Sequence, residues 1–473
     1  MIVTGIPCGS DEYVSDFVNK FLEELVEEVE RFKVIDKSHA KWAVLKQSIS
    51  KRIVHLQRGM TPLQINNTNL VERYKSILQD MLGDIMGVYR DNIEQHSMDI
   101  ASLRSIDGGG GLQYHGDNTL PAYVASFTAA LREIVKAYPI VEEMIQTEIR
   151  GEEWENDIRI PNRLVQYFQS IHTLAQAGSC IDGKNEVVSM KGLWELSQES
   201  NRLKGLQGRL CMYTHKYRLD KIREDLSALQ PYNFNHVQVL TSSSGSESAC
   251  VVNMVPREGH QIKDNHQFAN FLRRRFQGSE PEYFRNQTCK CGVRIDPYTW
   301  HLQKCSKFAK GRLETHEKLK HLISHMCSTA RIPHTLESIP FKQGRGEDEP
   351  ENRRRLDIVI NNPRLLKPDT RQTKMLLDQT VTHPTVHSGR LLVGGNHMVQ
   401  ATKDARAAND SEKLKHTKYD ADARQHNMEV CPMGFEVQGK WGQSTHQVFH
   451  LITTRMNNVN NASLLPKALS TSY

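Results

Sequence analysis

The sequence lacks any long run of uncharged apolar residues. Nowhere in its 473 residues does a stretch approach the roughly 18 that a membrane-spanning helix needs, so we expect no transmembrane segment and no membrane partner. The first residues, MIVTGIPCGSDEYV, lack the basic start and apolar core of a signal peptide. The nine cysteines are odd in number and mostly isolated, which argues against a secreted disulfide scaffold. We therefore expect an intracellular protein.

A strong excess of one charge is also missing. The net charge of +6 is modest for this length, so composition alone does not indicate nucleic-acid binding. Basic residues are nevertheless concentrated in two short runs. Such runs suit contacts with a nucleic-acid backbone, but they are about as often plain solvated surface. The two candidate runs are Arg273, Arg274, Arg275 and Arg353, Arg354, Arg355.

The first third of the chain has helical periodicity. Residues 10–34 predict an amphipathic helix with Ser10 as its N-cap, and further helical patterns cover residues 40–58, 69–96 and 120–149. We expect the apolar stripe of the first helix to be core rather than a ligand site. The residues of this stripe are Phe17, Phe21, Leu25, Val29 and Phe32.

From residue 261 the pattern changes. A basic helix leads into a cysteine-rich stretch, and the remainder alternates between helical and strand-like segments, which favours an α/β domain. The asparagine-rich tail is predicted to be disordered. The predicted segments are a basic helix at 267–276, helices at 311–327 and 398–420, strands at 334–340, 355–360 and 375–382, and the tail at 456–473.

The stretch CKCGVRIDPYTWHLQKC carries four potential metal ligands within 17 residues, namely Cys289, Cys291, His301 and Cys305. Three thiolates and an imidazole match a closed tetrahedral Zn²⁺ site. The second half, H-x₃-C, returns both ligands to one face of a helical turn, whereas the first half is C-x-C rather than the commoner C-x₂₋₄-C. With four protein ligands the zinc would be structural. The alternative is three buried free thiols beside an exposed histidine.

Two aspartates interrupt strand-like segments, Asp357 in LDIVI and Asp378 in LLDQTV. A carboxylate in a buried strand is costly unless another group compensates its charge. Clustered carboxylates on adjacent strands are what a Mg²⁺- or Mn²⁺-dependent phosphodiesterase needs. Glu337, in the preceding strand, is a further candidate ligand. The ordinary alternative is that these residues are turn formers or structural side chains.

The helix that follows these strands carries KLKHTKY, with Lys413, Lys415 and Lys418. Lys415 and Lys418 are three positions apart, so they project from one helical face. A lysine beside metal-binding carboxylates can orient the attacking water and stabilise developing charge. We therefore name Lys415 and Lys418 as candidate catalytic residues, although most helix lysines are simply solvated.

The order of these motifs resembles the C-terminal zinc and restriction-endonuclease-like region of site-specific non-LTR retrotransposon reverse transcriptases. The matching segments are the CCHC cluster, LETHEKL with His316, RRRLDIVI, LLDQTVTHPT and KHTKY. The most distinctive match is D-x-T-V-x-x-P, formed by Asp378, Thr380 and Pro384. Before residue 285, HLQRGMTP and SIDGGGGLQY are similar to thumb-side motifs of the same family.

The resemblance implies a multi-domain chain of the α plus α/β class. It implies that Asp357 and Asp378 hold Mg²⁺ or Mn²⁺, that His316 contacts DNA or RNA, and that the protein is nuclear. The polymerase motif Y/F-x-D-D is absent, so we expect no reverse transcriptase activity from this chain, which resembles a segment that follows the palm. The implied regions are a helical thumb-like region (1–150), a helical connector (151–260), the basic helix and zinc module (261–310), an endonuclease-like α/β domain with a mixed sheet (311–455) and the tail (456–473).

Three functions remain open at this level. The first is a metal-dependent DNA endonuclease that nicks a target site, with the zinc module and the basic helix gripping the backbone. The second is a catalytically inactive remnant that binds DNA or RNA. The third is a decayed reading frame with no selected activity. The sequence requires no particular oligomeric state.

Overall fold

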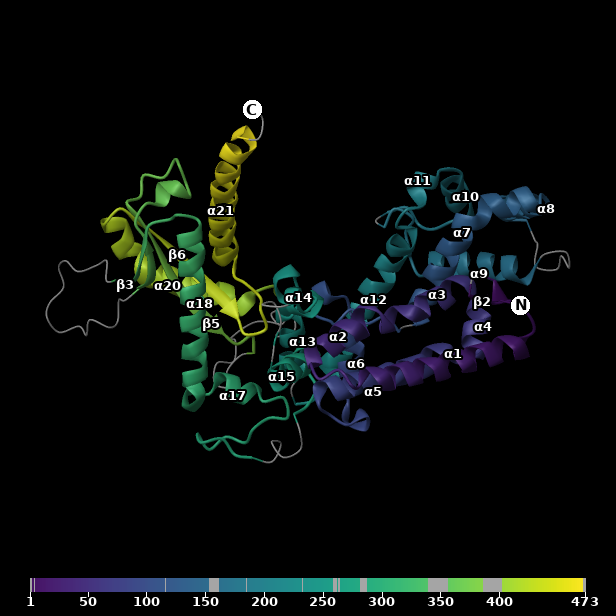
Figure 1. Cartoon of the computed structure of the whole chain (residues 1–473), viewed down its shortest axis with the longest axis horizontal. Coiled ribbons are helices and arrows are strands. Elements are labelled where there is room, and N and C mark those ends of the chain that lie inside the picture. The colour runs from purple at the N-terminus through teal and green to yellow at the C-terminus, as the bar shows by residue number, and fades with distance from the viewer. Residues whose placement is uncertain are drawn as a thin grey trace. The chain divides into compact units, whose positions relative to one another are not determined.

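The computed structural model describes residues 2–3, 5–114, 116–152, 161–183, 185–231, 233–257, 262, 264–280, 287–338, 356–385 and 402–470. Within these ranges the chain is mostly helical, and it divides into two compact units (Figure 1). Unit 1 comprises Met1–Asp225 and Val251–Ser279, and unit 2 comprises Leu226–Cys250 and Glu280–Tyr473. No described helix combines the length and apolar character needed to cross a membrane.

Unit 1 is built almost entirely of helices, with one two-stranded antiparallel sheet near the N-terminus. Its elements are β1 (Ile2–Val3), β2 (Ile6–Pro7), α1 (Asp11–Phe32), α2 (Ser38–Gln47), η1 (Ile49–Lys51), α3 (Arg52–Gly59), α4 (Pro62–Asn67), α5 (Leu70–Met86), η2 (Arg90–Asn92), α6 (Gln95–Ser102), η3 (Ser105–Asp107), η4 (Gly116–Asn118), α7 (Thr119–Ala137), α8 (Ile140–Arg150), α9 (Asn162–Gln176), α10 (Met190–Gln198), α11 (Ser200–Leu203), most of α12 (Leu206–Ala228), the end of α14 (Ser246–Asn253) and α15 (Asn265–Phe276).

Helix α1 forms where the sequence predicts it. The Ser10 side chain accepts a hydrogen bond from the Tyr13 N–H, which satisfies one of the free donors of the first turn. The buried stripe is shifted, however, from the predicted one. Phe17, Phe21 and Phe32 are half-buried and flank the true core stripe. That stripe consists of Val14, Val18, Leu22, Leu25 and Val29.

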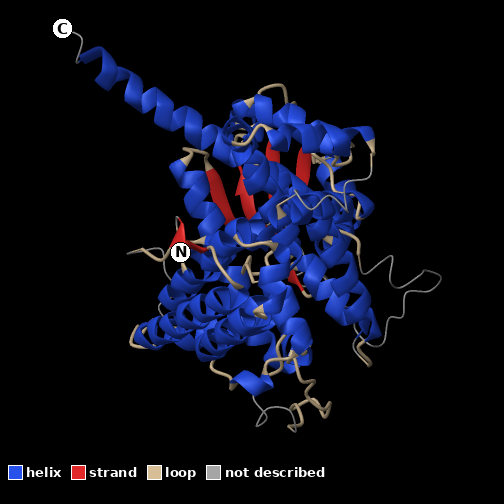
Figure 2. Ribbon diagram, turned by 90° about the vertical axis from the view of Figure 1, so that its right-hand side faces the viewer, coloured by secondary structure: helices blue, strands red, loops and turns tan. Residues whose placement is uncertain are grey.

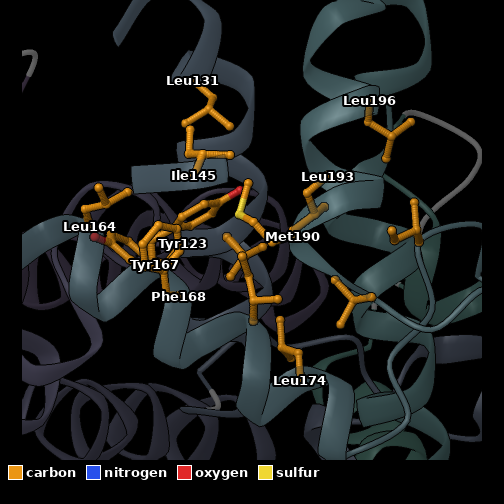
Figure 3. Close-up of a cluster of buried hydrophobic side chains, with 14 of the residues drawn as sticks. Tyr123, Leu131, Ile145, Leu164, Tyr167, Phe168, Leu174, Met190, Leu193 and Leu196 are labelled. Atoms are coloured by element: carbon orange, nitrogen blue, oxygen red, sulfur yellow. The ribbon is translucent and has the colours of Figure 1, made fainter. Parts of the chain in front are cut away.

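One hydrophobic cluster of the unit 1 core lies between α7, α8, α9 and α10 (Figure 3). Tyr123 and Leu131 come from α7, whereas Phe168 and Leu193 come from α9 and α10. The Thr128 hydroxyl and the Tyr167 hydroxyl lie 2.8 Å apart, so each provides the other with a hydrogen-bond partner within this apolar cluster. The regions predicted as 1–150 and 151–260 therefore share one core.

Unit 2 carries a four-stranded mixed sheet with helices on both faces (Figure 2). The strand order is β3-β4-β5-β6, in which β3, β4 and β5 are antiparallel neighbours and β6 runs parallel to β5. The elements are α13 (Asn233–Ser242), most of α14, α17 (Trp300–Lys304), η5 (Ser306–Phe308), α18 (Ala309–Thr329), β3 (His334–Ser338), β4 (Leu356–Ile360), η7 (Pro363–Leu365), β5 (Lys374–Thr382), α20 (Arg406–Gln425), β6 (Met428–Glu436) and α21 (Gln443–Ser470).

These elements confirm the strands predicted near 334, 355 and 375 and the helix predicted at 311–327, which the structure has as α18. The predicted region 261–310 is divided, because α15 belongs to unit 1 and the cysteine cluster to unit 2. Residues 456–470 are helical as the end of α21, where the sequence predicts a disordered tail. Alanine, leucine and lysine are strong helix formers, and they occupy most of its last turns despite Pro466.

Helix α20 is held close to the sheet by two features of β6. A Cβ on Gly434 would lie 2.4 Å from the Ala408 carbonyl oxygen, so only glycine permits this approach. The buried Glu436 carboxylate accepts the N–H of Ala407 at 2.9 Å and of Ala408 at 3.2 Å, which caps the first turn of α20. Burial raises the pKa of Glu436, while these hydrogen bonds oppose the rise. Together they fix the helix that carries KLKHTKY.

We predict that Gly434→Ala destabilises unit 2, because backbone atoms of α20 must move to admit the new methyl group. The expected loss is about 1–3 kcal/mol in the free energy of unfolding measured with denaturant. Gly208→Ala is the matched control, since a Cβ at that helical position meets nothing within 4 Å. It should be neutral or stabilise by up to about 1 kcal/mol. Equal effects of both changes would contradict the packing described here.

Candidate functional site

The four potential zinc ligands converge in the structure. One ligand atom from each of Cys289, Cys291, His301 and Cys305 lies within 4.8 Å of all the others. The Sγ atoms of Cys289 and Cys305 are 3.5 Å apart, and Cys291 Sγ is 3.1 Å from His301 Nε2. These separations suit a small ion with bonds of about 2.0–2.3 Å in tetrahedral geometry. Within the described ranges this is the one group of three or more such ligands that can hold a metal ion, such as zinc.

The backbone around the cluster is organised by local hydrogen bonds. Gly292, at φ +87°, lets the chain turn tightly so that the Cys289 N–H donates to Val293 O at 2.8 Å. On the other side, the Asp296 carboxylate accepts the backbone N–H groups of Trp300 at 3.0 Å and His301 at 2.7 Å. This caps α17 and orients His301 toward the three thiols. Local hydrogen bonds within this segment therefore hold the four ligand side chains in position.

The two strand aspartates lie opposite each other. The β4–β5 register pairs Ile358 with Leu377, so the next antiparallel step places Asp357 beside Asp378. The Asp378 side chain is 6% exposed and that of Asp357 is 15% exposed. Two carboxylates in such a place repel each other unless cations, protons or hydrogen-bond donors compensate their charges.

Asp357 is compensated from α18 and from the neighbouring strand. Its Oδ2 accepts the Gln379 N–H at 2.7 Å and lies 3.1 Å from His316 Nε2. Burial acts to raise the pKa of Asp357, but the His316 and Gln379 hydrogen bonds outweigh it, and the pKa is lowered. The same contact raises the pKa of His316, with burial opposing. These contacts favour the ionised form of Asp357.

Asp378 is compensated from the opposite face of the sheet, where Lys415 of α20 donates to its Oδ2 at 2.6 Å. Burial raises the pKa of Asp378, the Lys415 charge opposes this, and the negative charge of Asp357 reinforces it. The two carboxyl groups thus differ in proton affinity although they are cross-strand neighbours. Such pairs, with pKa values driven apart by their surroundings, are enriched at functional sites.

The other predicted residues of this site lie farther out. The Lys418 ammonium donates to the Tyr419 hydroxyl at 2.8 Å, and Lys413 is mostly exposed. Glu337 belongs to β3 and forms an ion pair with Lys320 of α18, whose own Nζ also lies 2.6 Å from Glu317. Glu337 has φ +54°, a left-handed conformation that costs a non-glycine residue about 1–2 kcal/mol. The two aspartates and Lys415 therefore meet directly, whereas Lys418 and Glu337 are held by other partners.

Two contributors to this site were not predicted from the sequence. Lys320 is buried and follows His316 by one helical turn, so α18 presents two basic side chains to strands β3 and β4. The hydrophobic spacing of 311–327 indicated the helix but not which face met the aspartates. The Gln379 backbone N–H is the second, since a main-chain donor leaves no trace in a residue pattern.

The basic run of α15 is largely internal to unit 1. Arg275 is 1% exposed and donates to the carbonyls of Gly109 at 3.0 Å and Ser105 at 2.8 Å. Arg273 is also buried and donates to Met86 O. Guanidinium groups engaged in this way stabilise loops and have little left for a phosphate, whereas Arg274 is exposed. The predicted contacts of Arg353, Arg354 and Arg355 fall outside the described residues.

Comparison with known proteins adds no relative. No protein-family model matches the chain, and no curated protein matches it. Any function for this chain must therefore be argued from the geometry of its own residues.

We predict that the purified protein retains about one zinc ion per chain after dialysis, and that Cys289→Ser abolishes this retention. The reason is that a closed site loses most of its affinity when one of four ligands is replaced. Metal content measured by mass spectrometry checks it. Cys250→Ser is the matched control, because Cys250 is an exposed thiol outside the cluster. Retention of zinc by Cys289→Ser would contradict the assignment.

We predict that the His316–Asp357 contact is worth about 1 kcal/mol of unfolding free energy at low pH and less at high pH. A raised folded-state pKa gives His316 a contribution that is complete below its unfolded pKa and lost as pH rises through the folded pKa. Denaturation of His316→Gln and of the unchanged protein at about pH 5.5 and about pH 8.5 measures this difference.

In a second measurement, proton NMR of His316 should show a lower pKa in Asp357→Asn. Asp369→Asn, at an exposed loop position, should leave the His316 titration unchanged. A stability difference that grows with pH, or the same titration in both variants, would be inconsistent with the contact.

Proposed function

We propose that unit 2 is a metal-dependent DNA endonuclease that hydrolyses phosphodiester bonds. The observation that carries this proposal is the opposed pair Asp357 and Asp378 with Lys415 on the second carboxylate. Mg²⁺ is usually bound by one or two carboxylates, with water and substrate phosphate completing its shell. Two aspartates side by side on neighbouring strands, one buried and one partly exposed, meet that requirement without further protein ligands. The resemblance of the motifs to retrotransposon endonuclease regions supports the same reading.

Each residue has a role in this proposal. Asp357, kept ionised by His316 and the Gln379 N–H, and Asp378 would hold Mg²⁺ or Mn²⁺, which when bound polarises the phosphate and activates water. Lys415 would place its positive charge where negative charge develops on the phosphate oxygens. Lys418, whose ammonium donates to the Tyr419 hydroxyl, would present its positive charge on the same face of α20 as Lys415. Glu337 would act through its ion pair with Lys320 rather than as a ligand.

The Cys/His group supports the nucleic-acid part of the proposal. A structural Zn²⁺ held by Cys289, Cys291, His301 and Cys305 would stiffen a short segment that has only a small apolar cluster of its own. Exposed basic side chains nearby, among them Lys290 and Lys307, would then contact backbone phosphates of DNA or RNA. A nuclear location is part of the same proposal.

A second function is favoured by one specific observation. Both aspartates already have a basic side chain as partner, so the pair is balanced by His316 and Lys415 without any ion. A protein of this kind can bind nucleic acid through its basic surface with no catalysis. Binding that weakens steeply with salt and needs no divalent ion is the signature of that alternative.

We predict that the full-length protein relaxes supercoiled plasmid in Mg²⁺ or Mn²⁺ and not in chelator. Asp378→Asn should lower the nicking rate at least about 100-fold, since the pair then lacks one anionic ligand. Gel electrophoresis of the nicked product gives the rate. Asp369→Asn is the control and should retain full activity.

Two outcomes would overturn the endonuclease. One is metal-dependent nicking that persists unchanged in both Asp357→Asn and Asp378→Asn. The other is folded, zinc-loaded protein that binds plasmid but does not nick it in the presence of Mg²⁺ or Mn²⁺, which would favour the binding function instead.

A further inference from the structure

Unit 1 contains a cavity whose walls are basic. Its volume is about 800 Å³, and no aspartate or glutamate is among the described residues that line it. Five lining side chains are cationic or titratable bases, contributed by α2, α3, the loop after α6, and α12. They are Lys46, Arg58, Arg104, His215 and Arg218.

Lys46 is the central feature of this cavity. It is 7% exposed, and its Nζ donates to Ser105 Oγ at 2.7 Å and to Asn253 Oδ1 at 2.5 Å. An ammonium has three donors, so one N–H remains beyond these two neutral partners. Burial, followed by the charges of Arg275 and Lys51, lowers the pKa of Lys46 to about 7. A buried ammonium without a carboxylate is expensive, and an incoming anion would relieve that cost.

The charges around the cavity leave an excess of two. Arg104 is paired with Asp107 at 2.5 Å and Arg218 with Asp117 at 2.7 Å. Of the four basic side chains Lys46, Arg58, Arg104 and Arg218, the last two are thereby neutralised. Arg58, and Lys46 in its protonated form, contact no carboxylate among the described residues. Arg58 instead donates to the Gln207 side-chain oxygen at 2.9 Å through Nε and 2.7 Å through Nη2. A dianion would balance this excess.

The remaining walls define the size and chemistry of the ligand. A volume of about 800 Å³ lies within the usual range for small-molecule sites and greatly exceeds what one inorganic phosphate fills. Val54, Leu112 and Leu206 supply an apolar wall, while Ser102 and Asn118 add neutral hydrogen-bonding groups. This combination suits a ligand with a phosphate at one end and a flat or apolar group at the other.

We propose that this cavity binds a terminal phosphate group of a nucleotide, with Lys46 and Arg58 as its two uncompensated cations. The proposal concerns unit 1 and does not depend on the endonuclease in unit 2. His215 on α12 lines the same space, and burial followed by the charges of Arg218 and Arg104 lowers its pKa to about 4, so the ligand meets a neutral imidazole at physiological pH.

The test is calorimetric titration of the full-length protein with inorganic pyrophosphate in chelator, so that no metal-dependent chemistry contributes. Binding should weaken at least tenfold in Lys46→Met, which keeps the length of the side chain and removes its charge. Arg58→Gln should have a similar effect, and because Arg58 is exposed this variant keeps the test valid if Lys46→Met folds poorly. Lys191→Met is the matched control, because Lys191 is an exposed lysine of α10 that does not line the cavity, and this variant should bind as the unchanged protein does.

Two further titrations identify the source of the phosphate. A nucleoside triphosphate that binds more tightly than a short 5′-phosphorylated single strand indicates a free nucleotide, and the reverse order indicates a nucleic-acid end. Absence of pyrophosphate binding to the unchanged protein overturns the proposal. Equal loss in Lys191→Met also overturns it, because binding would then reflect general surface charge.

Discussion

The structure of unit 2 depends on the cost of placing two carboxylates side by side in a sheet. Asp357 and Asp378 occupy positions where the surrounding strand residues are buried and apolar. Such a pair persists only if donors reach it from outside the two strands, and here they come from both faces. His316 on α18 serves the first aspartate and Lys415 on α20 serves the second. The helices are therefore fixed to the sheet by charge as well as by their apolar sides.

Several other features follow from this constraint. Lys415 can reach Asp378 only if α20 lies close to β5 and β6, which is where the missing side chain of Gly434 and the Glu436 cap hold it. On the opposite face, Ile323 and Cys327 of α18 pack into the core that α21 completes. The same helix then carries His316 past the end of that core to the aspartate. Apolar packing sets the position of each helix, and that position brings His316 and Lys415 within reach of the two aspartates.

The sequence predicted the parts of unit 2 better than their contacts. Asp357 and Asp378 stood out because a carboxylate in LDIVI or LLDQTV breaks a hydrophobic strand, and the zinc ligands stood out by their spacing. The sequence could not predict the side-chain contacts that depend on which face of a helix packs against the sheet. Lys418 and Lys415 share a helical face, yet only Lys415 meets a carboxylate. Arg273 and Arg275 resembled a basic surface, but their carbonyl partners come from the end of α5 and from the loop at residue 109, which no local pattern reveals.

The aromatic contacts of α13 have a consequence for how this chain can be divided. The His236 ring lies 4.6 Å from Tyr298 and 5.0 Å from Trp300, so a helix that precedes the basic segment by tens of residues covers the module of Cys289 and His301. The polypeptide enters unit 2 for Leu226–Cys250, returns to unit 1 for Val251–Ser279 and then enters unit 2 again. A C-terminal fragment cut after residue 250 would therefore expose the indole of Trp300, which is 2% exposed in the whole chain. Each unit is encoded in two separate pieces of sequence, and a single truncation point cannot release either one intact.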